Sequence, residues 1–297
     1  MKNTRLALVV VFSLVLTFGF LSAPARAQNK KALEIGAVAW EEALALADLV
    51  QYVVETEIGM NVNITNPSIG PAYTAVSNQD LDLLIESWQP LTHAAYMEQV
   101  AHEVTHFGPV YEDAKLTWAV PTYVPEDELN SISDLAKPEV KEKLNSEIIG
   151  IDPGAGLMQQ SEKMMEEYPA LSDYTLVPGS GAAMQASLKD AVLNDEWIVV
   201  TLWQPHSAYG RFDLRNLEEP EKILGAEERV YFIGRVDFNE VFPNEVSEFL
   251  SRLHLPISMV NDLTAMYGEM GEGAGAEWAE NHPEIIDYFL NGVDALE

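Results

Sequence analysis

Strand-like and helix-like segments alternate along the chain after Lys31, and this order constrains the fold more than any other feature. Short apolar runs bounded by turn residues predict strands, and the longer amphipathic runs between them predict helices. The expected strands are 35–39, 62–65, 81–85 and 115–120, followed by 148–151, 174–177, 197–203 and 229–236. The expected helices are 41–55, 71–77, 159–168 and 185–193, and the chain from 244 onward is mostly helical. Two such sets predict an α/β fold with two lobes that face one cleft, each lobe a mainly parallel sheet flanked by helices.

Residues 1–27 have the pattern of a secretory signal peptide and are set apart from the fold. Lys2 and Arg5 precede a continuous apolar run, 6–20, and the small-residue site Ala25-Arg26-Ala27 follows it. The apolar run is shorter than the roughly 20 residues of a membrane-spanning helix, so we expect cleavage before Gln28 rather than an uncleaved anchor. The chain contains no cysteine, which excludes a lipid-anchored form, disulfides and thiolate metal sites. The mature protein is therefore expected to be free in the periplasm.

The charge balance is strongly acidic. The signal segment holds three of the 17 Lys and Arg residues and none of the 47 Asp and Glu residues, which leaves 14 against 47, a net charge of −33. A surface this acidic argues against nucleic acid or an anionic membrane as the partner. Such a surplus is compatible with a saline habitat, but it bears on solubility and not on fold.

Three tryptophans, Trp40, Trp88 and Trp203, follow or end predicted strands. In open α/β sheets, ligands bind beyond the carboxyl ends of the strands, so these indoles are expected to converge on one cleft. An aromatic box suits a cation that cannot donate hydrogen bonds, above all a quaternary ammonium. The alternative is that each Trp packs in the core, and we expect this of the other three, which are Trp118, Trp197 and Trp278.

Two glycine-containing turns connect predicted strands to predicted helices. The turn 153–157, with sequence PGAGL, allows close approach of the backbone, and the free N–H groups of the following helix attract an anion. It lacks the Lys and Ser/Thr of a nucleotide-binding P-loop, so a carboxylate is the expected anion. The turn 178–181, with sequence PGSG, is expected to be structural support. His93, near a helix start, is a candidate second donor to the same carboxylate.

The sequence also contains a competing motif of another class. His102-Glu103-Val104-Thr105-His106 matches H-E-x-x-H, which on a helix supplies two zinc ligands and the general base of a metallopeptidase. However, Phe107-Gly108-Pro109 would end that helix at once, and no further histidine motif follows. Glu126 and Glu128 are the candidate third ligands, and both lie in a polar, proline-flanked loop. A zinc metallopeptidase is therefore the less favoured alternative.

With these motifs in order along the chain, the sequence resembles the glycine betaine/proline betaine-binding proteins of ABC importers, the OpuAC-like family. The resemblance covers nearly the whole mature chain and is carried by several segments. These are IGAVAWEE, AYTAVSNQDLDLLIESWQPLTH, IIGIDPGAGLM, VPGSGAAMQASL, WIVVTLWQPH, LRNLEEP and AEWAENHPEIIDYFLNG. It implies a two-lobed, type II-like periplasmic-binding-protein fold that closes over its ligand by a hinge. The implied lobes are 28–110 plus 232–297, and 111–231.

The resemblance also implies roles for single residues. The cage would consist of Trp40, Trp88 and Trp203, with His93 and the backbone N–H groups of Gly156 and Leu157 holding the ligand carboxylate. The implied function is binding, not catalysis, without a cofactor, and the implied partner is an inner-membrane ABC permease. Glycine betaine is the expected ligand, and choline, carnitine, trimethylamine N-oxide and dimethylsulfoniopropionate are the alternatives. Two departures from the family pattern, Asn78-Gln79-Asp80-Leu81-Asp82 and Ser207, leave room for altered ligand choice.

Overall fold

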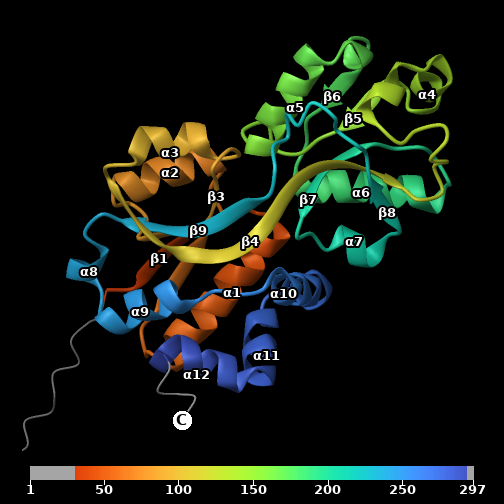
Figure 1. Cartoon of the computed structure of the whole chain (residues 1–297). Helices are drawn as coiled ribbons and strands as arrows, with labels where there is room; N and C mark the ends of the chain where they lie inside the picture. Colours follow the sequence, from red (N-terminus) through yellow and green to blue (C-terminus); the bar gives the residue numbers. More distant parts are fainter. Residues whose placement is uncertain (1–30, 293–297) are drawn as a thin grey trace, which may run out of the picture. The chain divides into compact units, whose positions relative to one another are not determined.

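The computed structural model describes residues 31–292, so the predicted signal peptide lies outside the described residues (Figure 1). Nine strands of this part of the chain form one sheet in the order β2-β1-β3-β9-β4-β7-β5-β6, and β8 pairs with β4 off this path. The strands are β1 (Leu33–Ala37), β2 (Val62–Thr65), β3 (Leu83–Gln89), β4 (Val104–Pro121), β5 (Glu147–Ile149), β6 (Thr175–Val177), β7 (Val200–Gln204), β8 (Leu214–Asn216) and β9 (Glu228–Arg235).

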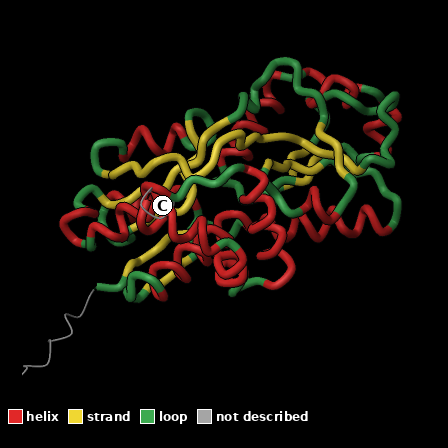
Figure 2. The backbone as a smooth tube through the Cα atoms, turned by 60° about the horizontal axis from the view of Figure 1, so that its bottom comes forward, coloured by secondary structure: helices red, strands yellow, loops and turns green. Residues whose placement is uncertain are grey.

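The two predicted parallel sets are present at the two ends of this sheet. Strand β1 pairs in parallel with β2 and β3, and β5 pairs in parallel with β6 and β7. Between them, β9 runs antiparallel to β3 and to β4, and β4 runs antiparallel to β7. The sheet is therefore mixed, with two antiparallel strands connecting two parallel sets. Figure 2 shows the strands in yellow and the helices around them in red.

Strand β4 is three times as long as the predicted segment 115–120. The prediction is too short because the first part of β4 lacks the regular apolar alternation of a strand. Gly108 and Pro109 interrupt the apolar alternation, and the register against β9 shifts three times between His106 and Ala114. Asp113, at the last of these shifts, has a φ of 63°. The predicted lobe boundaries, after residues 110 and 231, fall within β4 and β9.

The helices cover both faces of the sheet. They are α1 (Glu41–Thr56), α2 (Ile69–Ser77), α3 (Ala94–Val100), α4 (Pro138–Lys143), α5 (Gly156–Glu167), α6 (Gly181–Leu193), α7 (Ala208–Arg211), α8 (Phe238–Val241), α9 (Asn244–Arg252), α10 (Ile257–Met270), α11 (Ala274–Asn281) and α12 (Pro283–Asn291). Two short 3₁₀ helices, Ile132–Ala136 and Pro169–Leu171, complete the set. In Figure 1, α2 and α3 lie on one side of β3 and β9, and α1 and α9 lie on the other. None of the helices between residues 31 and 292 combines the length and apolar composition needed to cross a bilayer.

The C-terminal helices pack on α1, the helix that directly follows Trp40. A side chain at Gly275 would bring Cβ within 2.3 Å of the backbone nitrogen of Leu49, so α11 can approach α1 this closely only at a glycine. The carboxylate of Asp48 accepts hydrogen bonds from the N–H groups of Gly273 and Gly275, at 3.0 and 2.7 Å. These contacts satisfy free N–H groups at the start of α11 and fix the position of α1 against the C-terminal helices.

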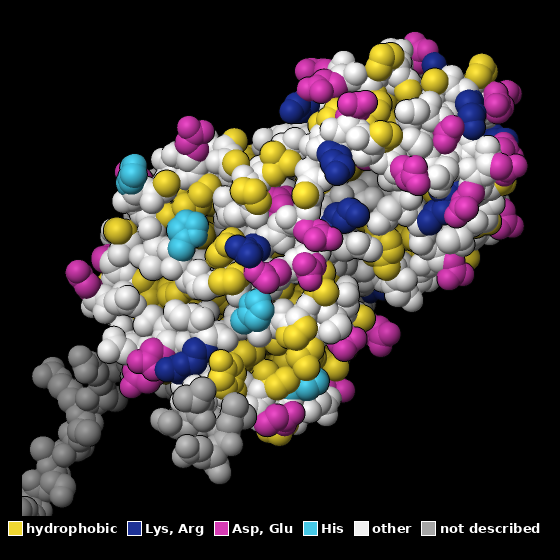
Figure 3. All heavy atoms as spheres, viewed as in Figure 1, with side chains coloured by type: hydrophobic (Ala, Val, Ile, Leu, Met, Phe, Trp, Pro, Cys, Tyr) yellow, Lys and Arg dark blue, Asp and Glu magenta, His cyan; other side chains and the backbone are white. Residues whose placement is uncertain are grey.

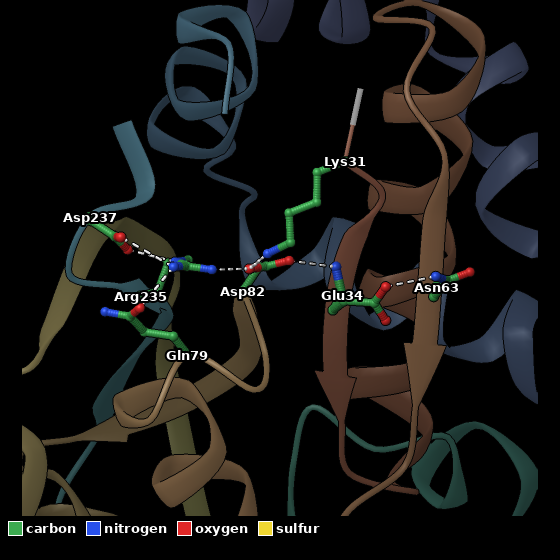
Figure 4. A network of polar contacts seen from close by, with 7 residues as sticks. All are labelled: Lys31, Glu34, Asn63, Gln79, Asp82, Arg235 and Asp237. Carbon is green, nitrogen blue, oxygen red and sulfur yellow. Dashed lines mark hydrogen bonds and ion pairs between the residues drawn. The ribbon is translucent and has the colours of Figure 1, made fainter. Parts of the chain in front are cut away.

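A buried polar network ties the starts of β1 and β3 to the end of β9 (Figure 4). Asp82 is fully buried and accepts hydrogen bonds from Arg235 Nη1 at 2.9 Å, from Lys31 Nζ at 2.5 Å and from the N–H of Glu34 at 3.0 Å. Arg235 also binds Asp237 and Gln79. A buried carboxylate needs such partners, because an unpaired charge in the interior is costly. In this segment, which departs from the family pattern, Gln79 and Asp82 therefore have structural contacts.

Acidic side chains are spread over the face seen in Figure 3, with Lys and Arg interspersed among them. Most ion pairs of the described residues involve half-exposed or exposed side chains, such as Lys163–Glu167 and Arg229–Glu112. Exposed pairs of this kind contribute about 0–1 kcal/mol each. The acidic surplus is therefore a property of the solvated surface and does not hold the fold together.

Candidate functional site

One cavity of about 270 Å³ is lined by all six residues that the sequence predicts for ligand binding. Its lining consists of Trp40, Glu42, Trp88, Thr92, His93, Leu116, Ile151, Ala155, Gly156, Leu157 and Trp203. These residues come from both parallel sets of strands and from the long strand β4.

The three indoles form walls of this cavity. Trp40 follows β1 and precedes α1, while Trp88 and Trp203 lie near the carboxyl ends of β3 and β7. Each is at most 6% exposed, and the rings of Trp40 and Trp203 are 6.2 Å apart at 60°. Trp88 packs edge-to-face on Tyr111, 6.4 Å away. The tilted rings enclose space instead of stacking on each other, as a site for a bulky cation requires.

Of the three other tryptophans, two are in the core as predicted. Trp118 and Trp278 are each 1% exposed and do not line the cavity. Trp197 packs against the core but is only half-buried, and Lys143 Nζ lies 3.9 Å from its ring centroid. Strand β7 begins at Val200, after the irregular segment that carries Trp197, so this indole lies at the edge of the core.

His93 is a neutral hydrogen-bond donor aimed from the N-terminus of α3. Its Nδ1 accepts the backbone N–H of Trp88 at 3.1 Å, which places the ring proton on Nε2. Burial lowers the pKa of His93 to about 3, so the ring is uncharged at neutral pH. The ring also stacks on Trp40, with centroids 6.1 Å apart and planes at 23°. His93 therefore offers one N–H next to the indole walls without adding a positive charge.

The N-terminus of α5 provides the other donors. Gly156 and Leu157 are its first two residues, no side chain caps it, and its first turn contains no acidic residue. The N–H groups of a first helical turn have no partner within the helix and attract anions. A Cβ at Gly156 would lie 2.1 Å from the carbonyl oxygen of Thr92, so only glycine allows α5 to approach the β3–α3 loop this closely.

The second glycine turn is structural support, as the sequence predicts. Ser180 caps α6 by accepting the N–H of Ala183 at 3.2 Å, and residues 178–181 do not line the cavity. A Cβ at Gly181 would be in ordinary contact with Trp40, at 3.8 Å. The turn thus lies behind one of the indole walls.

Contacts between the two parallel sets close the mouth of the cavity. Trp40 Nε1 donates to Asp152 at 3.4 Å, and the Tyr96 hydroxyl donates to the Gly154 carbonyl oxygen at 2.6 Å. On another side, Glu41 of α1 accepts hydrogen bonds from Ser207 and from Arg211, the latter at 3.3 Å. The arrangement is that of a closed cleft.

Sequence reasoning missed two buried glutamates of this region. Glu42 is fully buried in the cavity wall, and its Oε1 accepts the indole N–H of Trp203 at 2.5 Å. Glu228, 3% exposed, accepts the N–H groups of Leu91 and Thr92 at 2.7 and 3.0 Å and so holds the loop that leads to His93. The sequence carries no signal that separates Glu42 from Glu41, since two acids follow Trp40 in WEE.

A third buried carboxylate, Glu86 on β3, makes stability depend on pH. Burial raises its pKa to about 8, although Tyr111 donates a hydrogen bond to Oε1 at 2.9 Å. A carboxyl whose folded-state pKa is raised stabilises the fold below its unfolded pKa, and this contribution is lost as pH rises through the folded value. Between pH 5.5 and 8.5 the unfolding free energy of the ligand-free protein should therefore fall, by on the order of a few kcal/mol from this group.

Urea unfolding across this pH range measures the effect. Glu86→Gln, which keeps an acceptor for Tyr111, should flatten the pH dependence and raise stability at pH 8.5. Glu57→Gln, at an exposed glutamate, is the matched control and should leave the slope unchanged. Equal slopes for wild type and Glu86→Gln would show that Glu86 ionises freely in the folded protein.

The H-E-x-x-H motif does not lie on a helix, as a zinc site of this class requires. Helix α3 ends at Val100, His102 and Glu103 lie in a turn, and His106 belongs to β4, where it pairs with Ile233 of β9. Pairing in the sheet replaces the helical i, i+4 spacing that would bring the two histidines together on one face. Between residues 31 and 292, no group of three metal-ligating side chains is close enough to hold an ion. The described residues therefore do not support the metallopeptidase alternative.

Comparisons with known proteins all find similarity to substrate-binding proteins of ABC-type glycine betaine transport systems. The sequence model of OpuAC, the substrate binding domain of the ABC-type glycine betaine transport system, matches residues 31–289. Over 172 residues the chain is 31% identical to the glycine betaine/carnitine transport binding protein GbuC of Listeria monocytogenes, covering 54% of this chain and 55% of GbuC. The chain thus aligns with about half the length of that relative.

Two solved structures are similar over most of the chain. Lactococcal OpuAC, closed and complexed with glycine betaine, has a TM-score of 0.80 at 27% identity, covering 88% of this chain and all of that one. The glycine/betaine/L-proline-binding protein ProX of Borrelia burgdorferi has a TM-score of 0.81 at 27% identity, covering 90% and 99% of the two chains. These similarities confirm the predicted resemblance and the two-lobed α/β fold.

Proposed function

Because the chain belongs to the OpuAC family of substrate-binding domains of ABC-type glycine betaine transport systems, we propose that it binds a quaternary-ammonium zwitterion such as glycine betaine and delivers it to an ABC permease. The proposed site residues are Trp40, Trp88, Trp203, His93, Gly156 and Leu157. The function is binding and not catalysis. The predicted signal peptide makes the periplasm the proposed location.

One observation carries this proposal: a single cavity joins three indoles to hydrogen-bond donors that bear no full positive charge. The indole faces attract a methylated cation, at about 0.5–2 kcal/mol per contact and more when water is excluded. His93 Nε2–H and the free N–H groups at the start of α5 are suited to a carboxylate. A ligand with a methylated cation at one end and a carboxylate at the other matches both halves.

Closure over the ligand follows from the same contacts. Trp40, Trp88 and His93 belong to the first proposed lobe, and Trp203, Gly156 and Leu157 belong to the second. Strands β4 and β9 connect the lobes, and the irregular register near Asp113 is the proposed hinge. A ligand that bridges the two halves would stabilise the closed form, which is the form expected to dock on the permease.

Calorimetric titration of the mature protein with glycine betaine tests the proposal. We expect micromolar or tighter binding, because the ligand is desolvated between three indoles and its carboxylate meets preformed donors. Choline, carnitine, trimethylamine N-oxide and dimethylsulfoniopropionate should then be titrated in parallel. Tighter binding of choline or of the N-oxide would leave the indole cage in place but remove the proposed role of His93. Absence of binding to all five compounds would overturn the proposal.

A further inference from the structure

The cavity wall contains an ionisable group that none of the proposed ligand contacts uses. Glu42, on the first turn of α1, is fully buried, and its Oε2 has no hydrogen-bond partner among the described residues. Its Oε1 is held by the indole N–H of Trp203, one of the three cage residues. The carboxyl group is therefore fixed beside the space where the cation would lie, with one oxygen free.

The groups around Glu42 do not supply a compensating positive charge. Glu41 is its neighbour on α1, Glu86 approaches from β3, Tyr111 from β4, and Trp203 from β7. Arg211 on α7 pairs with Glu41, and no Lys or Arg of residues 31–292 forms an ion pair with Glu42 itself. Burial, and then the charge of Glu86, raise the pKa of Glu42 well above its ordinary value. These surroundings therefore favour the protonated form of Glu42.

We propose that Glu42 is a specificity-determining residue that keeps its proton when a zwitterion binds and releases it when a ligand with net positive charge binds. This inference rests on the proposed function of the cavity and adds to it a dependence of ligand choice on pH. At low pH the site would prefer the zwitterion, and rising pH would raise its affinity for a cation.

The two ligand classes differ in the field they impose on Glu42. A cation without a carboxylate presents an unopposed positive charge to the buried oxygen, so binding favours the ionised carboxylate and a proton passes to the buffer. In a zwitterion the carboxylate lies a few ångströms from the ammonium and opposes that field.

The nearby histidines do not contribute to a pH dependence of ligand affinity between pH 5.5 and 8.5. Burial lowers the pKa of His93 to about 3 and that of His206, which packs edge-on against Trp203, to about 4. Neither ring should change its charge between pH 5.5 and 8.5. A change in affinity over this range therefore reports on the buried carboxyl groups.

Calorimetry of the mature protein with choline and with glycine betaine, at pH 5.5, 7.0 and 8.5, tests the inference. Titrations in buffers of different ionisation enthalpy count the protons released. We expect choline affinity to rise at least tenfold over this range with proton release, and glycine betaine affinity to change less than threefold. Glu42→Gln should remove both the pH dependence of choline binding and the proton release that accompanies it.

Glu86→Gln is the matched second variant. It removes the second ionisable carboxyl group, whose charge opposes ionisation of Glu42, but keeps Glu42 ionisable, so the rise in choline affinity should move to lower pH instead of disappearing. Choline binding that is pH-independent or absent throughout, or an unchanged pH dependence in Glu42→Gln, would overturn the inference, while glycine betaine binding would still support the proposed function. If Glu42→Gln fails to fold, proton release by the wild type decides. Failure of both ligands to bind would overturn the function and the inference together.

Discussion

Replacing Trp88 with alanine should weaken glycine betaine binding at least tenfold. The indole is 3% exposed, lines the cavity and is held edge-on by Tyr111, so its face is preformed for a cation. Loss of one desolvated cation–π contact costs about 2 kcal/mol, and about 1.4 kcal/mol corresponds to tenfold in affinity. Calorimetric titration measures the loss, and circular dichroism and thermal unfolding establish that the variant is folded.

Trp197→Ala is the matched control, because this indole is half-buried, lies beneath Lys143 and does not line the cavity. It should leave the dissociation constant unchanged. Trp88→Phe should restore part of the affinity, since a smaller aromatic face remains at the same position. If Trp88→Ala folds and binds as tightly as the wild type, the cage assignment fails.

The parallel parts of the fold could be predicted from the sequence because their strands are short apolar runs with clear ends. Val62–Thr65 and Thr175–Val177 lie within or coincide with predicted segments. The antiparallel part could not, because pairing of β9 with both β3 and β4 depends on contacts far apart in sequence. The bulges between His106 and Ala114 also disturb the alternation by which a strand is recognised. The same irregularity covers the H-E-x-x-H motif, where a turn and the start of β4 take the place of a helix.

For the site, prediction succeeded where a residue type is unusual in its position. Indoles near strand ends and a glycine at a helix start stand out from their surroundings, and the three cage indoles and Gly156 meet in one cavity. Glu42 does not stand out, because acidic residues are common in the first turn of a helix, where they favour the helix dipole. Only its burial against β3 and β7 distinguishes it from Glu41, which binds Ser207 and Arg211 at the cavity mouth.

Gly156→Ala should weaken binding of glycine betaine by more than tenfold without unfolding the protein. The added methyl group would lie 2.1 Å from the Thr92 carbonyl oxygen and 2.6 Å from the Thr92 Cγ2 atom. Backbone at such a distance cannot give way cheaply, so the start of α5 would have to move away from the β3–α3 loop. The N–H groups of Gly156 and Leu157 would then no longer reach a carboxylate that His93 also holds. Calorimetric titration measures the affinity, and thermal unfolding without ligand measures stability.

Gly154→Ala provides a control two residues away in the same loop. A Cβ at Gly154 meets only the Tyr96 hydroxyl, at 3.8 Å, which is ordinary contact, so this variant should bind nearly as well as the wild type. In Gly156→Ala the ligand-free stability should change little, because Thr92 and Gly156 belong to different proposed lobes and the open form relieves the clash. A large loss of stability with unchanged affinity would mean that this contact holds the fold and not the closed cleft. Loss of affinity alone would show that binding requires the two lobes to meet at Gly156.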